Sequence, residues 1–239
     1  MIERYSTPEM VELWSEEHKL AVWKEVETLV VEAWVAEGMA PAAAATAARE
    51  APEVDPVAWK ERERVTNHDV AAFVDLLAAS VGEGGEWIHF GLTSSDVLDT
   101  ATGFVLGEAG QLLLGALVEL HTVVKRRAFE FKDTPMIGRT HGIWAEPTSF
   151  GLKLASWAFE IERDHDRLAE AVAGVAVGAI SGAVGTYAHT PPSVESYVCD
   201  RLGLNLEPAS TQVVARDRHA HFLSTLALTG ATIERIATE

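Results

Sequence analysis

The sequence predicts an all-α fold, in which a small N-terminal helical domain is followed by part of a long-helix bundle. Apolar residues recur at three- and four-residue steps through most of the 239 residues, which is the period of an α-helix. One such pattern continues unbroken for roughly 35 residues, which is longer than an ordinary globular helix and typical of a bundle. No segment alternates apolar and polar residues over enough positions to build a sheet.

The first domain is expected to contain short helices around a tryptophan-rich core. They are predicted at about Ser15–Glu37, after Pro41 in an alanine-rich stretch, after Asp55, and at Asp69–Val81. Trp14, Trp23 and Trp34 have roughly helical spacing and are expected in the core. We place the domain boundary near residue 93, so that residues 1–93 form the N-terminal helical domain and residues 94–239 form the central bundle domain.

Two long helices should dominate the bundle. The first starts after Asp96 and reaches about Phe131, a length of about 50 Å. Its expected apolar stripe is Leu98, Ala101, Val105, Ala109, Leu112, Ala116, Leu120 and Val123. The second is expected to start at Pro147, because the fixed φ of proline suits the first helical position. Its expected buried side is Phe150, Leu154, Trp157, Ile161, Leu168 and Val172.

A glycine-rich run at residues 173–189 interrupts the helices. It lacks the Gly-Lys-Ser/Thr ending and the helix-opening Gly-x-Gly-x-x-Gly of nucleotide-binding loops, so close helix packing or a turn is favoured over such a loop. A short helix near Val194–Leu202 and a last helix from about Asp217 follow. The last apolar pattern continues to Glu239 without a cap, so we expect the chain to stop inside a helix. Its apolar residues are Leu223, Leu226, Ile233 and Ile236.

The charge and cysteine content narrow the class of protein. With 19 Lys plus Arg against 36 Asp plus Glu, the net charge of −17 repels phosphate backbones and anionic membrane surfaces, so no nucleic-acid or membrane partner is expected. Apolar stretches such as residues 171–184 are too short and too glycine-rich to span a bilayer. Cys199 is the only cysteine, and the N-terminus carries no signal-peptide pattern. These features favour a soluble, cytoplasmic protein.

Three segments place polar residues immediately before a helix: TNHDVAAF (66–73), GLTSSDVL (91–98) and GRTHGIWAEP (138–147). Thr66 with Asp69, and Thr93 with Asp96, match the Ser/Thr-x-x-acid pattern of a capped helix. The plain interpretation of each segment is therefore a helix cap. The functional interpretation is an anion site, because N–H groups and hydroxyls at helix N-termini attract negative charge. The pattern alone leaves both interpretations open.

His68 and His141 stand apart from the other histidines because each lies in a polar turn that can project it into a cleft. Histidine transfers protons near neutral pH, since its unperturbed pKa is about 6.5. His219 and His221 look like a metal pair, but positions two apart on a helix point about 200° apart and cannot share one ion. No metal site is therefore expected.

Several stretches match one known family in order from residue 3 to residue 220. They are ERYSTPEM with Trp14, TNHDVAAF, WIHFGLTSSDVLDTA, GRTHGIWAEPTSFGLKLA, GAISGAVGTYA and STQVVARDRHA. Together they resemble the adenylosuccinate lyase family of the fumarase/aspartase superfamily. Within that superfamily, RTHG followed by AEPTSFG resembles this lyase rather than fumarase or argininosuccinate lyase.

The resemblance implies a long-helix bundle of the fumarase/aspartase type and cleavage of adenylosuccinate to AMP and fumarate in purine biosynthesis. It also implies release of fumarate from the succinylated aminoimidazole carboxamide ribotide earlier in the pathway. Both reactions are β-eliminations, in which a base removes a proton beside a carboxylate and an acid protonates the departing nitrogen. The implied substrate is an anionic purine nucleotide, with no cofactor. The implied assembly is a homotetramer whose active sites each use three subunits.

Carried over by position, the resemblance also implies roles for particular residues. His141 resembles the general acid at the leaving nitrogen, and His68 resembles a second imidazole near the phosphate or the acid. The implied substrate contacts are the nucleotide-binding pair Arg4 and Tyr5, Asn67 and Asp69 beside His68, the carboxylate binders Thr93 and Ser94, Thr140 next to the acid, and Gln212. From the residues alone, Arg4 and Tyr5 fit either a disordered end or a cation and a ring for a phosphorylated base.

One departure from the family concerns the base. The family's mobile loop, a Gly-Ser-Ser stretch followed by Met-Pro-x-Lys, supplies a serine base, and no such stretch occurs in these 239 residues. The rest of the bundle and a third domain are not matched either. We therefore expect the chain alone to be inactive or severely impaired. The alternatives are another fumarate-releasing lyase of the superfamily and a noncatalytic helical assembly module in which the polar turns are only caps.

Overall fold

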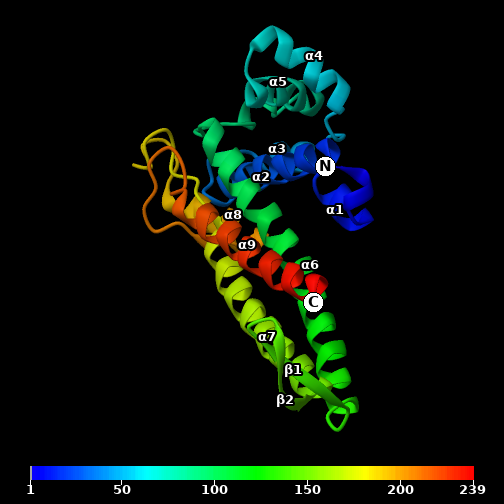
Figure 1. Ribbon diagram of the computed structural model, residues 1–239. Helices are drawn as coiled ribbons and strands as arrows, with labels where there is room; N and C mark the ends of the chain where they lie inside the picture. Colours follow the sequence, from blue (N-terminus) through cyan, green and yellow to red (C-terminus); the bar gives the residue numbers. More distant parts are fainter. Residues whose placement is uncertain (1) are drawn as a thin grey trace. The chain divides into compact units, whose positions relative to one another are not determined.

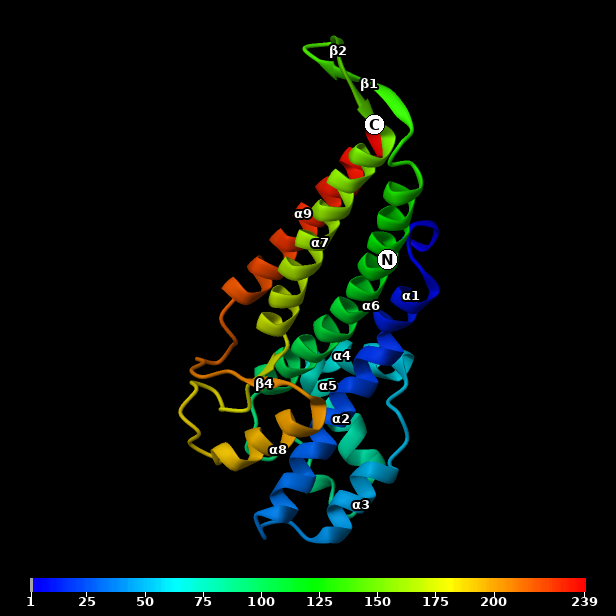
Figure 2. The same cartoon turned by 90° about the horizontal axis from the view of Figure 1, so that it is seen from below.

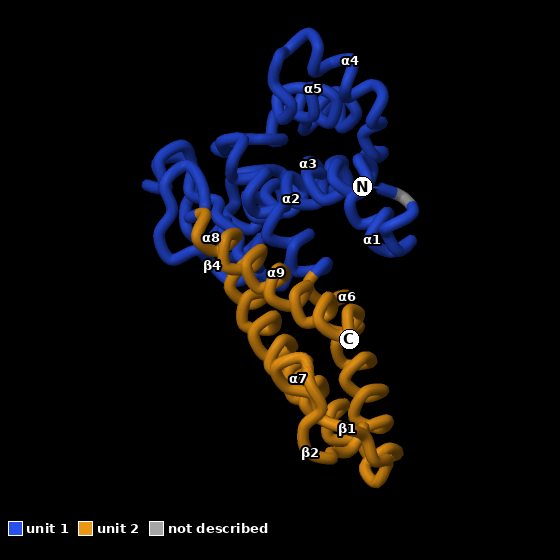
Figure 3. The backbone as a smooth tube through the Cα atoms, in the orientation of Figure 1, with its two compact units in different colours: residues 1–109, 176–215 blue, residues 110–175, 216–239 orange. Residues whose placement is uncertain are grey.

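The computed structural model describes residues 2–239 and is built mainly of α-helices (Figure 1). Contacts divide the chain into two compact units, each formed by two stretches of sequence (Figure 3). Unit 1 comprises Met1–Ala109 and Ala176–Ala215, and unit 2 comprises Gly110–Val175 and Arg216–Glu239. The boundary expected near residue 93 falls inside unit 1, directly before a long helix begins. The predicted all-α class is confirmed, with two small sheets added.

Short helices build unit 1 in the order that the periodicity predicts. The elements are η1 (Glu3–Tyr5), α1 (Pro8–Leu13), α2 (Glu16–Ala36), α3 (Ala42–Glu50), α4 (Pro56–Thr66), α5 (Asp69–Val81), η2 (Gly85–Trp87), the first part of α6 (Ser94–Glu130), β3 (Val177–Gly178), α8 (Pro192–Leu202) and β4 (Asn205–Leu206). The expected short helices correspond to α2, α3, α4 and α5. Ser15 and Asp55 cap α2 and α4 with side-chain oxygens that accept backbone N–H groups. The six-residue α1 is too short to show a period.

Much of α2 is buried in the core of unit 1. Trp23 packs edge-on against Trp59 and Phe73, with ring centroids 5.9 and 5.4 Å apart. Trp23 and Trp34 are each only 4% exposed, which confirms their predicted place in the core. The same prediction is wrong for Trp14, which is 45% exposed, because the chain turns there between α1 and α2. The buried rings remove a large apolar area from water, which stabilises this unit.

α6 is a continuous helix of 37 residues, close to the predicted length. In unit 1 its predicted stripe is buried, as at Ala101 and Val105. In unit 2 the prediction fails, since Leu112 and Val123 are 42% and 46% exposed. Within unit 2 the described chain covers only one side of α6, so part of the stripe lies open.

The length and hydropathy of α6 exceed what was expected, since the apolar stretches considered in the sequence are too short to span a bilayer. It is the one helix among residues 2–239 that is long and apolar enough to cross a membrane by length and composition, with a mean hydropathy of 1.5 over its best window. A third of that window (33%) is buried in the structure. Core helices of water-soluble proteins pass the same test, so this helix is weak evidence of membrane insertion.

Unit 2 combines the second part of α6 with α7 (Phe150–Val175) and α9 (Asp217–Thr238). α7 and α9 lie side by side in both ribbon views (Figures 1 and 2). α7 buries the predicted residues Leu154, Ile161, Leu168 and Val172, whereas Phe150 and Trp157 are half-buried. The predicted face of α7 is therefore the packed face.

α9 packs on α7 with a face other than the one predicted. Leu223 and Ile233 are 62% and 49% exposed, whereas Thr225, Thr229 and Thr232 are buried. The distance between two packed helices depends on the side chains at the contact, and threonine is small. The apolar side of α9 is left open to solvent in this chain.

A β-hairpin that the sequence reading did not predict connects α6 to α7 (Figure 2). Its strands, β1 (Pro135–Thr140) and β2 (Ile143–Ser149), are antiparallel. A second, very small sheet pairs β3 and β4 in parallel within unit 1. The hairpin escaped prediction because a shift in register breaks the regular alternation between Ile137 and Arg139.

The predicted start of the second long helix at Pro147 is wrong. Pro147 lies in β2, where it pairs with Ile137. Proline is tolerated there because both strands of a two-stranded hairpin are edge strands. The helix begins at Phe150 instead, and Ser149 Oγ accepts a hydrogen bond from the N–H of Leu152 at 3.1 Å, as a capping residue does.

Two glycines of α6 test the packing of unit 2. At Gly110 a methyl group would lie 2.3 Å from Cγ2 of Val172 on α7, whereas at Gly115 nothing lies within 4 Å. Gly110→Ala is expected to lower the free energy of unfolding by about 1–3 kcal/mol, because the stiff valine does not move aside. Gly115→Ala is expected to raise it by up to about 1 kcal/mol, the difference in helix propensity. Chemical denaturation measures both shifts, and shifts of the same sign would contradict this packing.

Candidate active site

Four predicted site residues come together in unit 1 where α6 begins. Ser94 is the first residue of α6, and its Oγ lies 3.3 Å from Nε2 of His68. Thr93 precedes it, and Nε2 of Gln212 donates to Thr93 Oγ1 at 3.4 Å. We call this group of His68, Thr93, Ser94 and Gln212 the α6 corner. It joins three segments that are far apart in the sequence.

His68 is held in one orientation because it is the N-cap of α5. Its Nδ1 accepts a hydrogen bond from the N–H of Ala71 at 3.3 Å. When Nδ1 accepts, the proton of the neutral ring is assigned to Nε2, which then donates toward Ser94 Oγ. The predicted cap at Thr66 is wrong, since Thr66 ends α4 and its hydroxyl donates to the carbonyl of His68 at 2.8 Å.

Asn67 and Asp69 flank His68 and make different contacts. Asn67 follows α4 in the left-handed conformation, with φ of 52°, which asparagine tolerates, and it is exposed. Oδ1 of Asp69 accepts from the N–H of Val70 at 2.8 Å and lies 3.3 Å from Nδ1 of His68. Asp69 therefore contacts the ring nitrogen opposite the one that faces the α6 corner.

Asp96 ties the start of α6 to the glycine-rich run. Its Oδ2 accepts from the N–H of Thr93 at 2.8 Å, which is the carboxylate half of the predicted capping box. Its Oδ1 accepts from the N–H groups of Ser181 and Gly182 at 3.1 and 3.2 Å. Burial raises the pKa of Asp96, and these three N–H donors oppose the rise. Asp96 is thus buried and occupied by backbone donors, which suits it to hold segments in place.

The α6 corner has the donors that an anion requires. The Thr93 hydroxyl accepts from Gln212, which leaves its own proton for a ligand. The Ser94 hydroxyl and Nε2 of His68 lie beside it at the positive end of a long helix, where carboxylates and phosphates bind readily. Within residues 2–239, no three His, Cys, Asp or Glu side chains are grouped as metal ligands.

The structure also contains a buried ion pair that was not predicted from the sequence. One of its two partners, His89, lies four residues before Thr93. Glu27 of α2 is fully buried, and its carboxylate accepts from the backbone N–H of His89 at 2.7 Å and binds Nδ1 of His89 at 2.6 Å. Burial opposes the charge on His89, but the hydrogen bond and charge of Glu27, with the charge of Asp96, raise the pKa of His89. The available signal was an acidic residue inside an apolar run of a helix.

This ion pair predicts how stability depends on pH. A histidine whose pKa rises on folding contributes stability that is fully present below its unfolded pKa of about 6.5 and is lost as the pH rises through the folded value. His89→Asn removes the titrating ring, and asparagine tolerates the φ of 63° at this position. The stability advantage of wild type over His89→Asn is therefore expected to shrink as the pH rises above about 6.5. Urea denaturation over a pH series measures it, and a constant difference would contradict the ion pair.

His141 and Thr140 lie in unit 2 at the tip of the hairpin. Thr140 pairs with Ile143, which leaves His141 and Gly142 as a two-residue turn. Both turn residues have positive φ, 54° and 74°, as in a type I′ turn. His141 is exposed, and its ring makes no hydrogen bond within the described part of the chain. The ring is therefore presented on a tight turn, as the sequence predicts.

Arg4 and Tyr5 form a pair within η1 of unit 1. The guanidinium lies over the Tyr5 ring, 4.7 Å from its centroid, and also donates to the Tyr5 hydroxyl. Tyr5 is 71% exposed. The pair presents a cation and an aromatic face to solvent, in line with the cation-and-ring interpretation.

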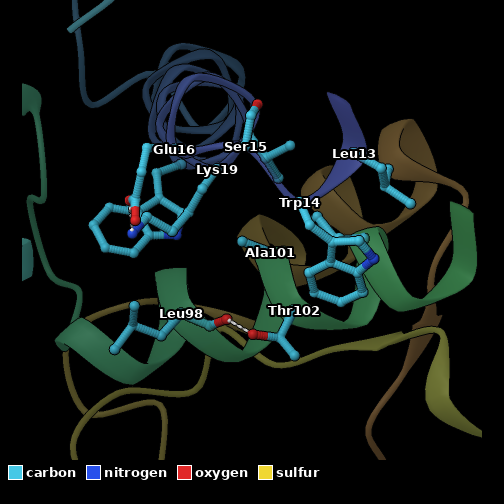
Figure 4. A pocket seen from close by; sticks show the side chains of 11 residues that line it. Leu13, Trp14, Ser15, Glu16, Lys19, Leu98, Ala101 and Thr102 are labelled. Atoms are coloured by element: carbon cyan, nitrogen blue, oxygen red, sulfur yellow. Dashed lines mark hydrogen bonds and ion pairs between the residues drawn. The ribbon is translucent and has the colours of Figure 1, made fainter. Parts of the chain in front are cut away.

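A separate cavity of about 240 Å³ lies in unit 1, between the α1–α2 turn and α6 (Figure 4). Its walls are mainly apolar and include Trp14 and Leu98. The polar groups that line it are already paired: Thr102 donates to the carbonyl of Leu98 at 2.7 Å, and Lys19 pairs with Glu16. None of the predicted site residues lines this cavity, so it is distinct from the α6 corner.

Comparisons with known proteins cover the whole chain. A family model described as lyase matches residues 3–239. The adenylosuccinate lyases of Bacillus subtilis and Thermotoga maritima are 48% and 51% identical over 239 residues, which is 100% of this chain and 56% of each relative. The chain thus spans little more than half the length of these curated relatives.

Solved structures show the same fold. A fumarate lyase from a Mesorhizobium species superimposes with a TM-score of 0.91 at 29% identity, over 98% of this chain and 56% of that one. A β-carboxy-cis,cis-muconate cycloisomerase from Acinetobacter calcoaceticus gives 0.90 at 26% identity, over 97% and 56%. The resemblance to the adenylosuccinate lyases is confirmed by the sequence identities. Since its model matches nearly every residue, the chain belongs to the lyase family.

Proposed function

We propose that the full-length protein that carries this chain cleaves adenylosuccinate to AMP and fumarate, and the succinylated aminoimidazole carboxamide ribotide to its amide and fumarate. The observation that carries the proposal is the α6 corner, where an imidazole, two hydroxyls and an amide converge on a helix N-terminus. That arrangement suits the carboxylates of such a substrate. Relatives named adenylosuccinate lyase, 48% and 51% identical over the whole chain, support the choice of substrate.

The proposed reaction is a β-elimination. The C–H bond beside a carboxylate and the C–N bond to the purine amino group break, and the C=C bond of fumarate forms. In this proposal His141 is the general acid that protonates the departing nitrogen. Thr93 and Ser94 hold a carboxylate, His68 donates beside them, and the positive end of α6 offsets the negative charge that builds up.

The remaining predicted contacts are assigned to substrate binding. They are Arg4, Tyr5, Asn67, Asp69, Thr140 and Gln212. The proposal needs a base as well, and the serine-bearing stretch of the family does not occur in these 239 residues. We therefore propose that the chain by itself is inactive or severely impaired.

We also propose a homo-oligomer, a tetramer in the full-length protein, located in the cytoplasm. Unit 2 exposes apolar side chains on α9, and the hairpin exposes Ile143 and Trp144 at 66% and 77%. Large exposed apolar surfaces mark association sites, and an isolated two-stranded hairpin is only marginally stable. A cytoplasmic location is supported by the cysteine content, since Cys199 is the one cysteine of the sequence and is buried.

Fumarate release from adenylosuccinate tests the proposed function, with argininosuccinate offered as a competing substrate. The full-length protein is expected to cleave adenylosuccinate and to leave argininosuccinate intact. Preferential cleavage of argininosuccinate would assign the protein to another lyase of the superfamily. Absence of fumarate from both would favour the noncatalytic helical module.

A further inference from the structure

The glycine-rich run forms a loop in unit 1 that the proposed function does not yet use. Between Ser181 and Tyr187 the chain takes positive φ at Gly182, Gly185 and Tyr187, with values of 81°, 75° and 54°. The N–H of Tyr187 donates to the carbonyl of Ser181 at 3.0 Å and closes the loop on itself. We call residues 181–187 the glycine loop.

Both ends of the glycine loop are anchored by buried carboxylates. At the first end, Asp96 of α6 accepts from the N–H groups of Ser181 and Gly182. At the second end, the Tyr187 hydroxyl donates to Oε2 of Glu195 on α8 at 2.8 Å. Burial, together with the hydrogen bond and charge of Glu195, raises the pKa of Tyr187 to about 12, so the phenol keeps its proton and stays a donor. The loop is therefore held in place at pH values near neutrality.

The middle of the glycine loop lies directly on the segment that precedes Gln212. A Cβ atom at Gly185 would be 2.2 Å from the carbonyl oxygen of Ser210 and 3.0 Å from that of Thr211. The Ser181 and Ser210 hydroxyls are also hydrogen-bonded at 2.7 Å. Because the obstacle is backbone, no side chain can be accommodated at residue 185 without moving residues 210 and 211.

A displacement of residues 210 and 211 would also move the next residue, which is part of the α6 corner. Gln212 follows them directly, and its Nε2 donates to Thr93 Oγ1 at 3.4 Å. On the other side, the N–H of Val214 is fixed by Oδ2 of Asp99 at 2.7 Å, in a buried contact. The short stretch carrying Gln212 is thus held between the glycine loop and α6.

We propose that Gly185 is a positioning residue for the α6 corner: its missing side chain lets the glycine loop seat residues 210–211, and this places the Gln212 amide on Thr93. Gly185 contacts no substrate in this scheme and acts only through Gln212. The inference rests on the proposed function for its catalytic consequence. Its structural half, the placement of Gln212, stands independently.

Gly185→Ala tests the proposal, with Gly182→Ala as the matched control. Both glycines have positive φ, so both variants carry similar backbone strain, but nothing lies within 4 Å of a Cβ at Gly182. In the 239-residue chain, the side-chain NH₂ resonances of Gln212, assigned with Gln212→Ala, are expected to shift in Gly185→Ala and to stay in place in Gly182→Ala. In the full-length protein, Gly185→Ala is expected to raise KM for adenylosuccinate by about five- to tenfold more than the control, the value of one lost hydrogen bond.

Tyr187→Phe provides a second variant that adds no steric clash. It removes only the hydrogen bond to Glu195 and is expected to shift the Gln212 resonances in the same direction and by less. Equal Gln212 spectra in wild type, Gly185→Ala and Tyr187→Phe would overturn the positioning role. Wild-type protein that releases no fumarate from adenylosuccinate, while the Gln212 resonances still respond to Gly185→Ala, would overturn the proposed function and leave the positioning intact.

Discussion

Replacing His141 with alanine is expected to lower kcat for fumarate release from adenylosuccinate by about 10²- to 10⁴-fold, the usual contribution of a general acid. The two-residue turn at His141 and Gly142 presents the ring with no internal partner within the described chain, so the substitution removes the imidazole and no internal hydrogen bond. His141→Asn, which tolerates the φ of 54°, is expected to lose kcat to the same extent and separates loss of the imidazole from strain in the turn. KM is expected to change little, because proton transfer acts in the transition state. Steady-state kinetics of the full-length protein measure both constants.

His165→Ala is the matched control for that experiment. His165 is also a histidine of unit 2 with a partly exposed side chain, and its Nδ1 lies 3.4 Å from Oδ1 of the neighbouring Asp166. The control is expected to keep kcat within about twofold of wild type, as surface substitutions usually do. Fumarate release that survives His141→Ala at the wild-type rate would remove His141 from the acid role. The hairpin would then be left as a structural or assembly element.

Replacing Glu27 with alanine is expected to lower the free energy of unfolding by about 3–5 kcal/mol, because breaking a buried ion pair leaves an uncompensated charge. The variant loses both bonds to His89, at 2.7 Å to the backbone N–H and 2.6 Å to Nδ1. His89 has a φ of 63°, and those bonds hold the segment that leads to Thr93. Urea denaturation below about pH 6.5, where the ion pair contributes fully, measures the loss.

Glu25→Ala is the control on the same helix. Glu25 pairs with Arg49 on the surface, with side chains 40% and 43% exposed, and surface pairs contribute about 0–1 kcal/mol. Similar losses for Glu27→Ala and Glu25→Ala would mean that the buried pair contributes no more than a surface pair. A large loss confined to Glu27→Ala would identify the pair as the anchor of the segment before α6.

Most of the helices could be predicted from the sequence because each depends on local periodicity and on nearby caps. The helix expected from about Ser15 begins at Glu16 and the helix expected after Asp55 begins at Pro56, and Ser15 and Asp55 cap α2 and α4 in the structure. The prediction failed where the partner of an element decides its form. Pro147 has the local signature of a helix start, yet it pairs with Ile137 in a hairpin.

In the candidate site, too, some residues could be predicted from the sequence and others could not. The polar turn before a helix singled out His68, and the family resemblance added Thr93, Ser94 and Gln212. The structure brings these four residues together. Nothing local to Glu27 indicated that it binds a residue 62 positions away. The Thr66 cap was also misassigned, because His68 occupies that position with its own ring.

By itself the sequence determined the all-α class, the order of the helices and the motifs that mark the lyase family, since these depend on periodicity and on residue identity along the chain. Only the tertiary structure decided which face of α9 is buried, how the hairpin joins α6 to α7, and why residue 185 must be glycine. The buried face of α9 and the glycine at residue 185 are set by contacts between residues far apart in the sequence, and the hairpin by the pairing of two neighbouring strands. The free energy of such contacts depends on burial and on the partner that each group finds, neither of which a local pattern records.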